Sequence, residues 1–222
     1  MLDIFDILGP IMVGPSSSHT AGAVRIGNMA RSLLGSEPKA VEIGLHGSFA
    51  ETGRGHGTDR ALVAGLLGMK PDDLRIPRSF ELAKQKGFAF SFRNVELKEA
   101  HPNTALLTIS DGAGRTLEMQ AASTGGGRIR VDRLDGIDVN FTGAFNTLII
   151  HSTDVPGKLA EVTRELEQGN VNIANMNLCR AKRGGSVLMV IETDQKVPPL
   201  VRALIEELKD VTRVTYYERE DT

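Results

Sequence analysis

The chain has 222 residues, of which 41% are hydrophobic and 24% are charged, and its formal net charge is -2. This is the balance of an ordinary soluble globular protein, and it gives no indication of a nucleic-acid partner. Since no apolar run approaches the roughly 20 residues that a membrane-spanning helix requires, we expect no membrane partner either.

The first thirteen residues, MLDIFDILGPIMV, are apolar but include Asp3 and Asp6 and lack a basic segment. They are therefore not typical of a secretory signal, and we expect a cytoplasmic protein. Residues 20–35 follow with apolar side chains at helical spacing, and Gly35 stands where a helix would stop. This pattern predicts a helix over 20–35.

The next segment alternates apolar and polar residues over 39–49, which predicts a half-buried strand. Residues 51–59 are rich in glycine, and we expect a loop there. That loop would deliver Thr58 or Asp59 as the cap of an apolar helix over 60–68.

The rest of the first part combines one short helix with several strands, some of them joined by hairpins. Such a mixture predicts an α/β (α+β) domain, not a barrel or a helical bundle. The helix is expected over 79–87, and the strands over 88–98, 104–111, 116–124 and 128–139.

The second part, from about Asn146, has a clearer order of strand, helix, strand, strand, helix, strand. This is the ferredoxin-like βαββαβ unit, and Gly169 would close its first helix. We therefore expect a first domain over 1–135, a linker over 136–146 and a second domain over 147–222.

The run GPSSSHT at 14–20 offers more hydroxyls than one helix start needs. Ser and Thr are preferred helix caps, but a single hydroxyl is enough for capping. Several hydroxyls and N–H groups converging before a helix would instead form an anion pocket, and His19 adds a group that moves protons near neutral pH. Spacing alone leaves a site and an elaborate cap equally supported.

Three further segments are ambiguous when each is taken alone. His56 lies in GRGHGTD, which lacks the lysine of a phosphate loop, and a lone loop histidine is more often solvated than functional. The tripeptide HPN at 101–103 contains ordinary turn residues, and STGGG at 123–127 is either room for a ligand or a flexible turn. Three glycine-rich loops that carry hydroxyls and imidazoles are nevertheless more than turns require.

In the second part, Asp154 and Gly157 are expected at a strand-to-helix turn, and Asn172 and Asn175 in the next strand. A carboxylate and amides beside a helix start can hold the two charged ends of an amino acid. For Asp154 alone, capping of the helix is the favoured alternative.

Four motifs in series, GPSSSHT (14–20), HGSFAETGRGHGTD (46–59), HPNT (101–104) and STGGG (123–127), resemble those of the iron–sulfur-dependent bacterial L-serine dehydratases. The whole chain is most similar to their separately encoded β subunit. Its second part resembles an ACT domain, an amino-acid-sensing module, and its first part is similar to a substrate-binding-type domain of some phosphoglycerate dehydrogenases.

The resemblance implies conversion of L-serine to pyruvate and ammonia with a [4Fe–4S] cluster. Because the chain has a single cysteine, Cys179, it cannot hold such a cluster, which needs about four thiolates. The ligands would then belong to an α subunit.

Roles for individual residues follow from the same resemblance. His19 would be the base or proton relay at the substrate Cα. The substrate carboxylate would be held, and the pocket closed, by Ser16, Ser17, Ser18, Thr20, His56, Asn103, Ser123, Thr124 and Gly125. An effector at the ACT domain would contact Ser152, Asp154, Gly157, Asn172 and Asn175.

Ser152 and Asp154 depart from the familiar serine-sensing pattern. A non-catalytic regulatory protein that senses an amino acid therefore remains the alternative function. In either case we expect a homodimer or an αβ assembly, because ACT modules commonly pair side by side.

Overall fold

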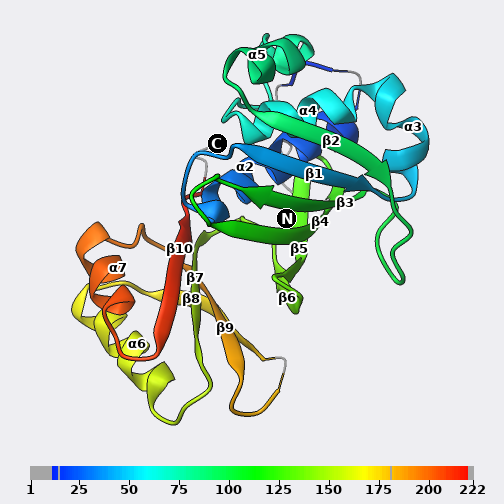
Figure 1. Ribbon diagram of the computed structural model, residues 1–222. Helices are drawn as coiled ribbons and strands as arrows, with labels where there is room; N and C mark the ends of the chain where they lie inside the picture. The colour runs from blue at the N-terminus through cyan, green and yellow to red at the C-terminus, as the bar shows by residue number, and fades with distance from the viewer. Residues whose placement is uncertain (1–11, 15, 181, 220–222) are drawn as a thin grey trace, which may run out of the picture. The chain divides into compact units, whose positions relative to one another are not determined.

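The computed structural model describes residues 12–14, 16–180 and 182–219 (Figure 1). The N-terminal segment considered as a secretory signal lies mostly outside these residues. The chain divides into two compact units between Gly136 and Ile137. The predicted linker over 136–146 contains a strand, β6 (Ile137–Phe141), and the predicted domain limits stay a prediction.

The first unit contains a helical layer and a sheet. The predicted first helix is confirmed and ends at Gly35, which is left-handed. It is preceded by one turn of π-helix, which the sequence did not predict. The helical elements are η1 (Ser17–Gly22), α2 (Ala23–Leu34), α3 (Ser48–His56), α4 (Thr58–Leu66), η2 (Ile76–Arg78) and α5 (Ser79–Gln85).

The strands of this unit lie in the order β2-β1-β3-β4-β5. Strand β1 is parallel to β2 and antiparallel to β3, and the pairs β3–β4 and β4–β5 are antiparallel. Helix α2 packs against β3 and β4 (Figure 1). The strands are β1 (Ala40–Leu45), β2 (Ala89–Asn94), β3 (Thr104–Ser110), β4 (Thr116–Gly125) and β5 (Arg128–Leu134).

The predicted glycine-rich loop over 51–59 is wrong. Most of it belongs to α3, which begins at Ser48 and buries Phe49 completely. The break comes at Gly57, whose φ of 74° is left-handed, and α4 follows at once. Gly57 is also the N-cap of α4, so the expected cap by Thr58 or Asp59 is wrong.

Helices α2 and α4 pack through two glycines. A methyl group at Gly65 would lie closer than 3.0 Å to the Val24 carbonyl oxygen, the Asn28 amide nitrogen and the Gly27 Cα. Because all three atoms are backbone, the two helices can approach this closely only where both lack side chains. This contact fixes α2, which continues from η1, against α4, which continues from α3.

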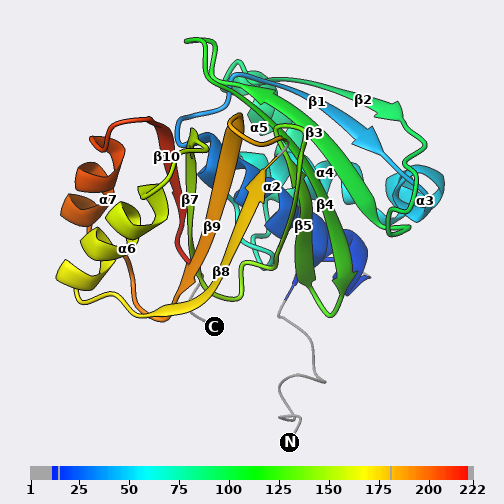
Figure 2. The same ribbon diagram turned by 90° about the horizontal axis from the view of Figure 1, so that it is seen from below.

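The second unit confirms the predicted βαββαβ order. Its four-stranded sheet has the order β10-β7-β9-β8, with antiparallel neighbours. Figure 2 shows α6 and α7 on one face of this sheet, where Leu148, Val162, Met189 and Ile205 form part of the core. The elements are β7 (Asn146–Thr153), α6 (Lys158–Gln168), β8 (Ile173–Arg180), β9 (Ser186–Thr193), α7 (Pro199–Glu206) and β10 (Val211–Tyr217).

Within the ranges described above, the helices are all too short or too polar to cross a membrane.

Candidate active site

The GPSSSHT run contains a helix cap and a histidine that lies among hydroxyl groups. Ser16 is the N-cap of η1, and its hydroxyl oxygen accepts a hydrogen bond from the His19 backbone N–H at 3.3 Å. The Ser16 carbonyl accepts from the Thr20 N–H at 2.9 Å. Ser17 begins η1 and is half-buried. Capping therefore uses one hydroxyl of the four, as the sequence indicated.

His19 is buried and lies among four hydroxyl groups from two separate elements. On one side, its Nδ1 lies 3.3 Å from each of the hydroxyl oxygens of Ser16 and Ser18. On the other side, its Nε2 lies 3.1 Å from Thr52 Oγ1 and 3.3 Å from Ser48 Oγ, both on α3. We call these four side chains and His19 the hydroxyl cage.

Two rings border the imidazole of the hydroxyl cage. Phe49 contacts it edge-on at a centroid distance of 5.3 Å, and the His56 ring lies 4.9 Å away. Burial lowers the pKa of His19, and the neighbouring His56 lowers it further, whereas a hydrogen bond with the Ser48 backbone acts in the opposite direction. His19 is therefore held as the neutral imidazole near neutral pH.

Two more predicted hydroxyls are buried next to η1. Thr20 Oγ1 and Ser123 Oγ have no hydrogen-bond partner among the described residues, although both atoms are fully buried. Ser123 lies so close to Gly22 that a side chain at Gly22 would collide with the Ser123 hydroxyl. Buried hydroxyls normally find a partner, so these two have unused hydrogen-bonding capacity, as does Thr58 Oγ1 at the start of α4.

A cavity of about 230 Å³ lies beside the hydroxyl cage. Its wall includes Thr20 and His56, two residues that the sequence singled out, together with Arg60 at the start of α4. The full lining is Val13, Gly14, Thr20, Gly55, His56, Gly57, Arg60, Ile76 and Pro77. A hollow of this size, with an imidazole and a guanidinium in its wall, suits a small molecule that carries polar groups.

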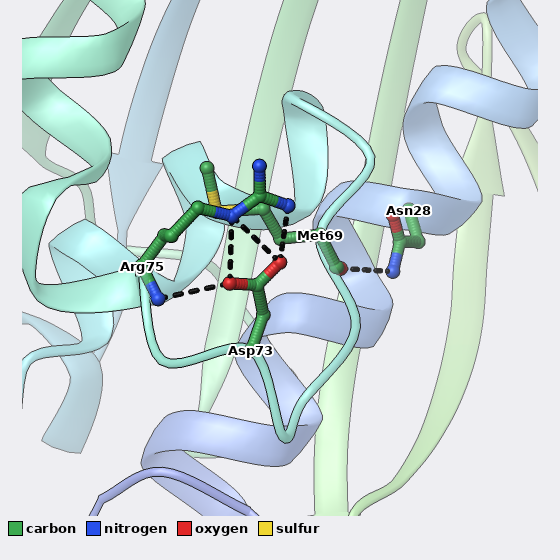
Figure 3. Close-up of polar contacts among 4 residues, drawn as sticks. All are labelled: Asn28, Met69, Asp73 and Arg75. Carbon is green, nitrogen blue, oxygen red and sulfur yellow. Dashed lines mark hydrogen bonds and ion pairs between the residues drawn. The ribbon is translucent and has the colours of Figure 1, made fainter.

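The loop before η2 supports the far wall of this cavity. Asp73 accepts hydrogen bonds from the Arg75 backbone N–H at 2.8 Å and from its guanidinium, with Nη2 at 2.6 Å (Figure 3). These bonds lower the pKa of Asp73. Asn28 of α2 donates to the Met69 carbonyl at 2.9 Å, so the loop is fixed to the same helix that continues from His19.

The HPNT and STGGG motifs meet next to these elements. The Asn103 carbonyl accepts from the Ser123 N–H at 2.9 Å, so Asn103 contributes here through its backbone. Pro102 lies against Gly47 at the start of α3. Ser123, Thr124 and Gly125 are the end of β4, not a loop, and the Thr124 side chain is exposed. Only Ser123 of this group thus faces η1.

Comparison with known proteins decides the family. Residues 1–87 match the family model "Serine dehydratase beta chain", and residues 146–210 match the ACT domain model. The probable L-serine dehydratase β chain of Bacillus subtilis (strain 168) is 41% identical over 212 residues, which cover 96% of each chain. The chain belongs to the L-serine dehydratase β-chain family. The resemblance predicted from the four motifs, with an ACT domain at the C-terminal end, is therefore confirmed.

Similar proteins include a chain of about the same length and a much longer one. The L-serine dehydratase β chain of Peptoniphilus asaccharolyticus is 39% identical over 96% of this chain and 97% of its own. L-serine dehydratase 2 of Escherichia coli (strain K12) is 42% identical over 82 residues, which are 34% of this chain but 18% of that protein. A β-chain segment therefore also occurs within a much longer polypeptide.

The donor groups of this chain do not fit an iron–sulfur cluster. Cys179 is the single cysteine, and burial raises the pKa of its thiol, which disfavours the thiolate that binds iron. Over the described ranges, His, Cys, Asp and Glu side chains nowhere gather in threes as a metal site would need.

The structure does not bring the predicted effector residues of the ACT domain together. Ser152 is buried near the end of β7, beside Val187 at the start of β9. Asn172 precedes β8 at the opposite end of the sheet, where it donates to Asp194 at 2.6 Å. Asn175 donates to the buried Glu192 at 2.9 Å. One chain therefore does not offer these residues to one small ligand.

Asp154 joins two turns of the second unit, and its predicted contact with an effector stays a prediction. Gly157, which is left-handed with a φ of 88°, is the N-cap of α6, so the expected capping by Asp154 is wrong. The Asp154 carboxylate instead accepts from the Gly184 N–H at 2.9 Å and from Arg180 at 3.0 Å. These bonds lower its pKa and join the β7–α6 turn to the β8–β9 hairpin.

Sequence reasoning missed Ser48 and Thr52, which provide two of the four hydroxyl groups of the hydroxyl cage. They lie one helical turn apart in the motif HGSFAETGRGHGTD, and both contact the same nitrogen of His19. Their spacing of four residues was the available signal, but it has meaning only if the segment is a helix. The expectation of a loop over 51–59 concealed it.

Proposed function

We propose that this chain is the β subunit of an L-serine dehydratase that converts L-serine to pyruvate and ammonia. In this proposal it supplies substrate-binding and proton-transfer groups. The observation that carries the proposal is the hydroxyl cage, which holds a buried neutral imidazole beside a cavity bordered by His56 and Arg60. The names of its relatives supply the substrate.

His19 is the proposed base. Elimination of water from serine requires loss of the Cα proton, and a neutral imidazole accepts a proton whereas an imidazolium does not. Because burial and His56 lower the pKa of His19, its lone pair is available near neutral pH. The contacts of about 3.3 Å around its ring are loose, as is common before a substrate binds.

Hydroxyl groups are the proposed ligands of the serine carboxylate. Thr20 Oγ1 and Ser123 Oγ are buried without partners in the described chain, and a carboxylate would accept a hydrogen bond from each. Ser16 and Ser18 lie on the Nδ1 side of His19 and extend this set toward the reacting atoms. Of these hydroxyl residues, Thr20 borders the cavity together with His56 and Arg60, and the Arg60 guanidinium there favours an anionic substrate.

The cluster of the enzyme is assigned to an α subunit. A chain with one cysteine cannot provide the thiolates, so the partner would bring both the cluster and the rest of the active site. The longer relative from Escherichia coli supports this arrangement, because the matching segment accounts for 18% of its length.

The decisive experiment replaces the base. The His19→Gln variant and the wild-type chain are each combined anaerobically with the α subunit and iron, and pyruvate formation from L-serine is followed. His151→Gln, in the second unit, is the matched control. We expect turnover to fall by about 100-fold or more for His19→Gln and to stay near normal for the control. Near-normal turnover of His19→Gln would reject the assignment.

Amino-acid sensing through the ACT domain is the second proposed function. The observation that favours it is Ser152 Oγ, which is buried and has no hydrogen-bond partner within the described part of the chain. Strand β8 is the last strand of its sheet, and Met176 and Leu178 on it are exposed, which suits pairing with a second copy. Calorimetric titration of the isolated chain with L-serine tests this function: tight binding without activity in the reconstituted enzyme would favour a purely regulatory protein.

A further inference from the structure

The contacts of Thr52 determine which nitrogen of His19 carries the proton. The Thr52 hydroxyl donates to the Ser48 carbonyl oxygen one turn earlier in α3, at 2.8 Å. A hydroxyl has one proton, so Thr52 Oγ1 has only lone pairs left for its second contact. That contact is His19 Nε2 at 3.1 Å, the shortest of the four hydroxyl contacts to the imidazole ring.

We propose that Thr52 is a positioning residue that holds neutral His19 in the tautomer with its proton on Nε2. An Nε2 lone pair would face the lone pairs of Thr52, whereas an Nε2–H donates to them. The basic lone pair is then on Nδ1. The tautomer follows from the contacts of this chain alone, whereas its use in catalysis rests on the function proposed above.

The opposite side of the ring suits a lone pair. The Ser16 hydroxyl oxygen already accepts from the His19 backbone N–H, but its own proton is free to be donated. Ser16 Oγ and Ser18 Oγ lie 3.3 Å apart, and each lies 3.3 Å from Nδ1. Either the Ser16 or the Ser18 hydroxyl can therefore donate a hydrogen bond to a lone pair on Nδ1.

The Ser16 and Ser18 hydroxyls can either donate to Nδ1 or accept from it, so the Nε2 side decides the tautomer, and there Ser48 is the side chain that could support the other one. Its hydroxyl lies 3.3 Å from Nε2 and also 3.3 Å from Thr52 Oγ1, so it can donate to either. The Thr52 contact opposes this alternative, because it is shorter, at 3.1 Å, and the Thr52 hydroxyl proton is already given to the Ser48 carbonyl.

The tautomer determines which nitrogen of His19 accepts the proton of the substrate. A proton removed from the substrate Cα arrives at Nδ1, either directly or through the Ser16 or Ser18 hydroxyl, which passes its own proton on as it receives one. Nε2–H keeps its proton, and Thr52 then stabilises the resulting imidazolium. The substrate Cα is therefore expected on the Ser16 and Ser18 side of the ring, not on the side of Ser48 and Thr52.

Nitrogen NMR of the full chain labelled with ¹⁵N-histidine tests this directly, since protonated and unprotonated ring nitrogens have very different chemical shifts. The His19 signals are those that disappear in His19→Gln. At alkaline pH we expect Nε2 to be the protonated nitrogen of wild-type His19. Thr52→Val keeps the shape but removes the acceptor, and we expect the tautomer ratio to move about tenfold toward Nδ1–H, as loss of one hydrogen bond predicts.

Two companion variants separate this role from a general effect on packing. Thr52→Ser restores the hydroxyl and should restore the wild-type spectrum, and Ser48→Ala should leave Nε2–H in place. In the reconstituted enzyme, kcat of Thr52→Val should fall in proportion to the lost Nε2–H fraction, with KM unchanged. A wild-type spectrum with Nδ1–H, or a Thr52→Val spectrum identical to wild type, would overturn the inference. Neither result depends on whether His19→Gln loses activity.

Discussion

The contact between α2 and α4 allows a quantitative test of how the site is supported. In Gly65→Ala, the new methyl group would lie closer than 3.0 Å to backbone atoms of Val24, Gly27 and Asn28. Overpacking of a core costs about 1–3 kcal/mol, and here no side chain can rotate away to relieve it. Alanine regains about 1 kcal/mol of helix propensity. The upper end of the overpacking range applies to contacts with backbone atoms, so we expect a net loss of about 2 kcal/mol in the free energy of unfolding.

Calorimetric unfolding of the full chain measures this loss, which corresponds to a Tm lowered by about 5 °C. Gly55→Ala is the matched control, because Gly55 is also helical but a methyl group there meets no atom within 4 Å. The control should keep its Tm or gain slightly from the higher helix propensity of alanine. A Gly65→Ala chain that unfolds at or above the wild-type temperature would refute the close helix contact.

Two further predictions concern the pH dependence of stability and the hydrogen exchange of one hairpin amide. The pKa of His19 is lower in the folded chain than in the unfolded chain. As the pH falls, the unfolded chain therefore takes up a proton on His19 before the folded chain does. The free energy of unfolding should decrease as the pH falls below about 6.5 and level off below the folded pKa. Urea unfolding at several pH values should show this decrease in wild type and a smaller one in His19→Gln. In Asp154→Asn, the β8–β9 hairpin loses a charged acceptor, so hydrogen exchange at the Gly184 amide should become faster. Unchanged exchange there would mean that Asp154 does not hold the hairpin.

The elements with strong periodicity could be predicted from the sequence. The helix that ends at Gly35 and the βαββαβ order of the second unit follow from apolar spacing and turn residues, and both are confirmed. Gly53 and Gly55 misled the prediction over 51–59, because glycine lowers helix propensity. Tertiary packing overrides that preference here, since α3 buries Phe49 beside His19.

The candidate site could be predicted only in part for a related reason. Ser16, Ser18, His19 and Thr20 are adjacent in sequence, so their convergence at one turn is a local property. That Ser48 and Thr52 complete the hydroxyl cage depends on how α3 docks onto η1, and no local pattern contains that information. The π-helical form of η1 is equally invisible to spacing rules, because such turns are rare and depend on their surroundings.

The parallel pairing of β1 and β2 has a consequence for how this architecture can be divided. Parallel neighbours cannot be joined by a hairpin, so the chain leaves the sheet after β1 and returns only at Ala89. All four hydroxyls around His19 come from residues 16–52, before that return. The hydroxyl cage is thus encoded in one continuous stretch of chain, although the later elements α4, β3 and β4 hold that stretch in place.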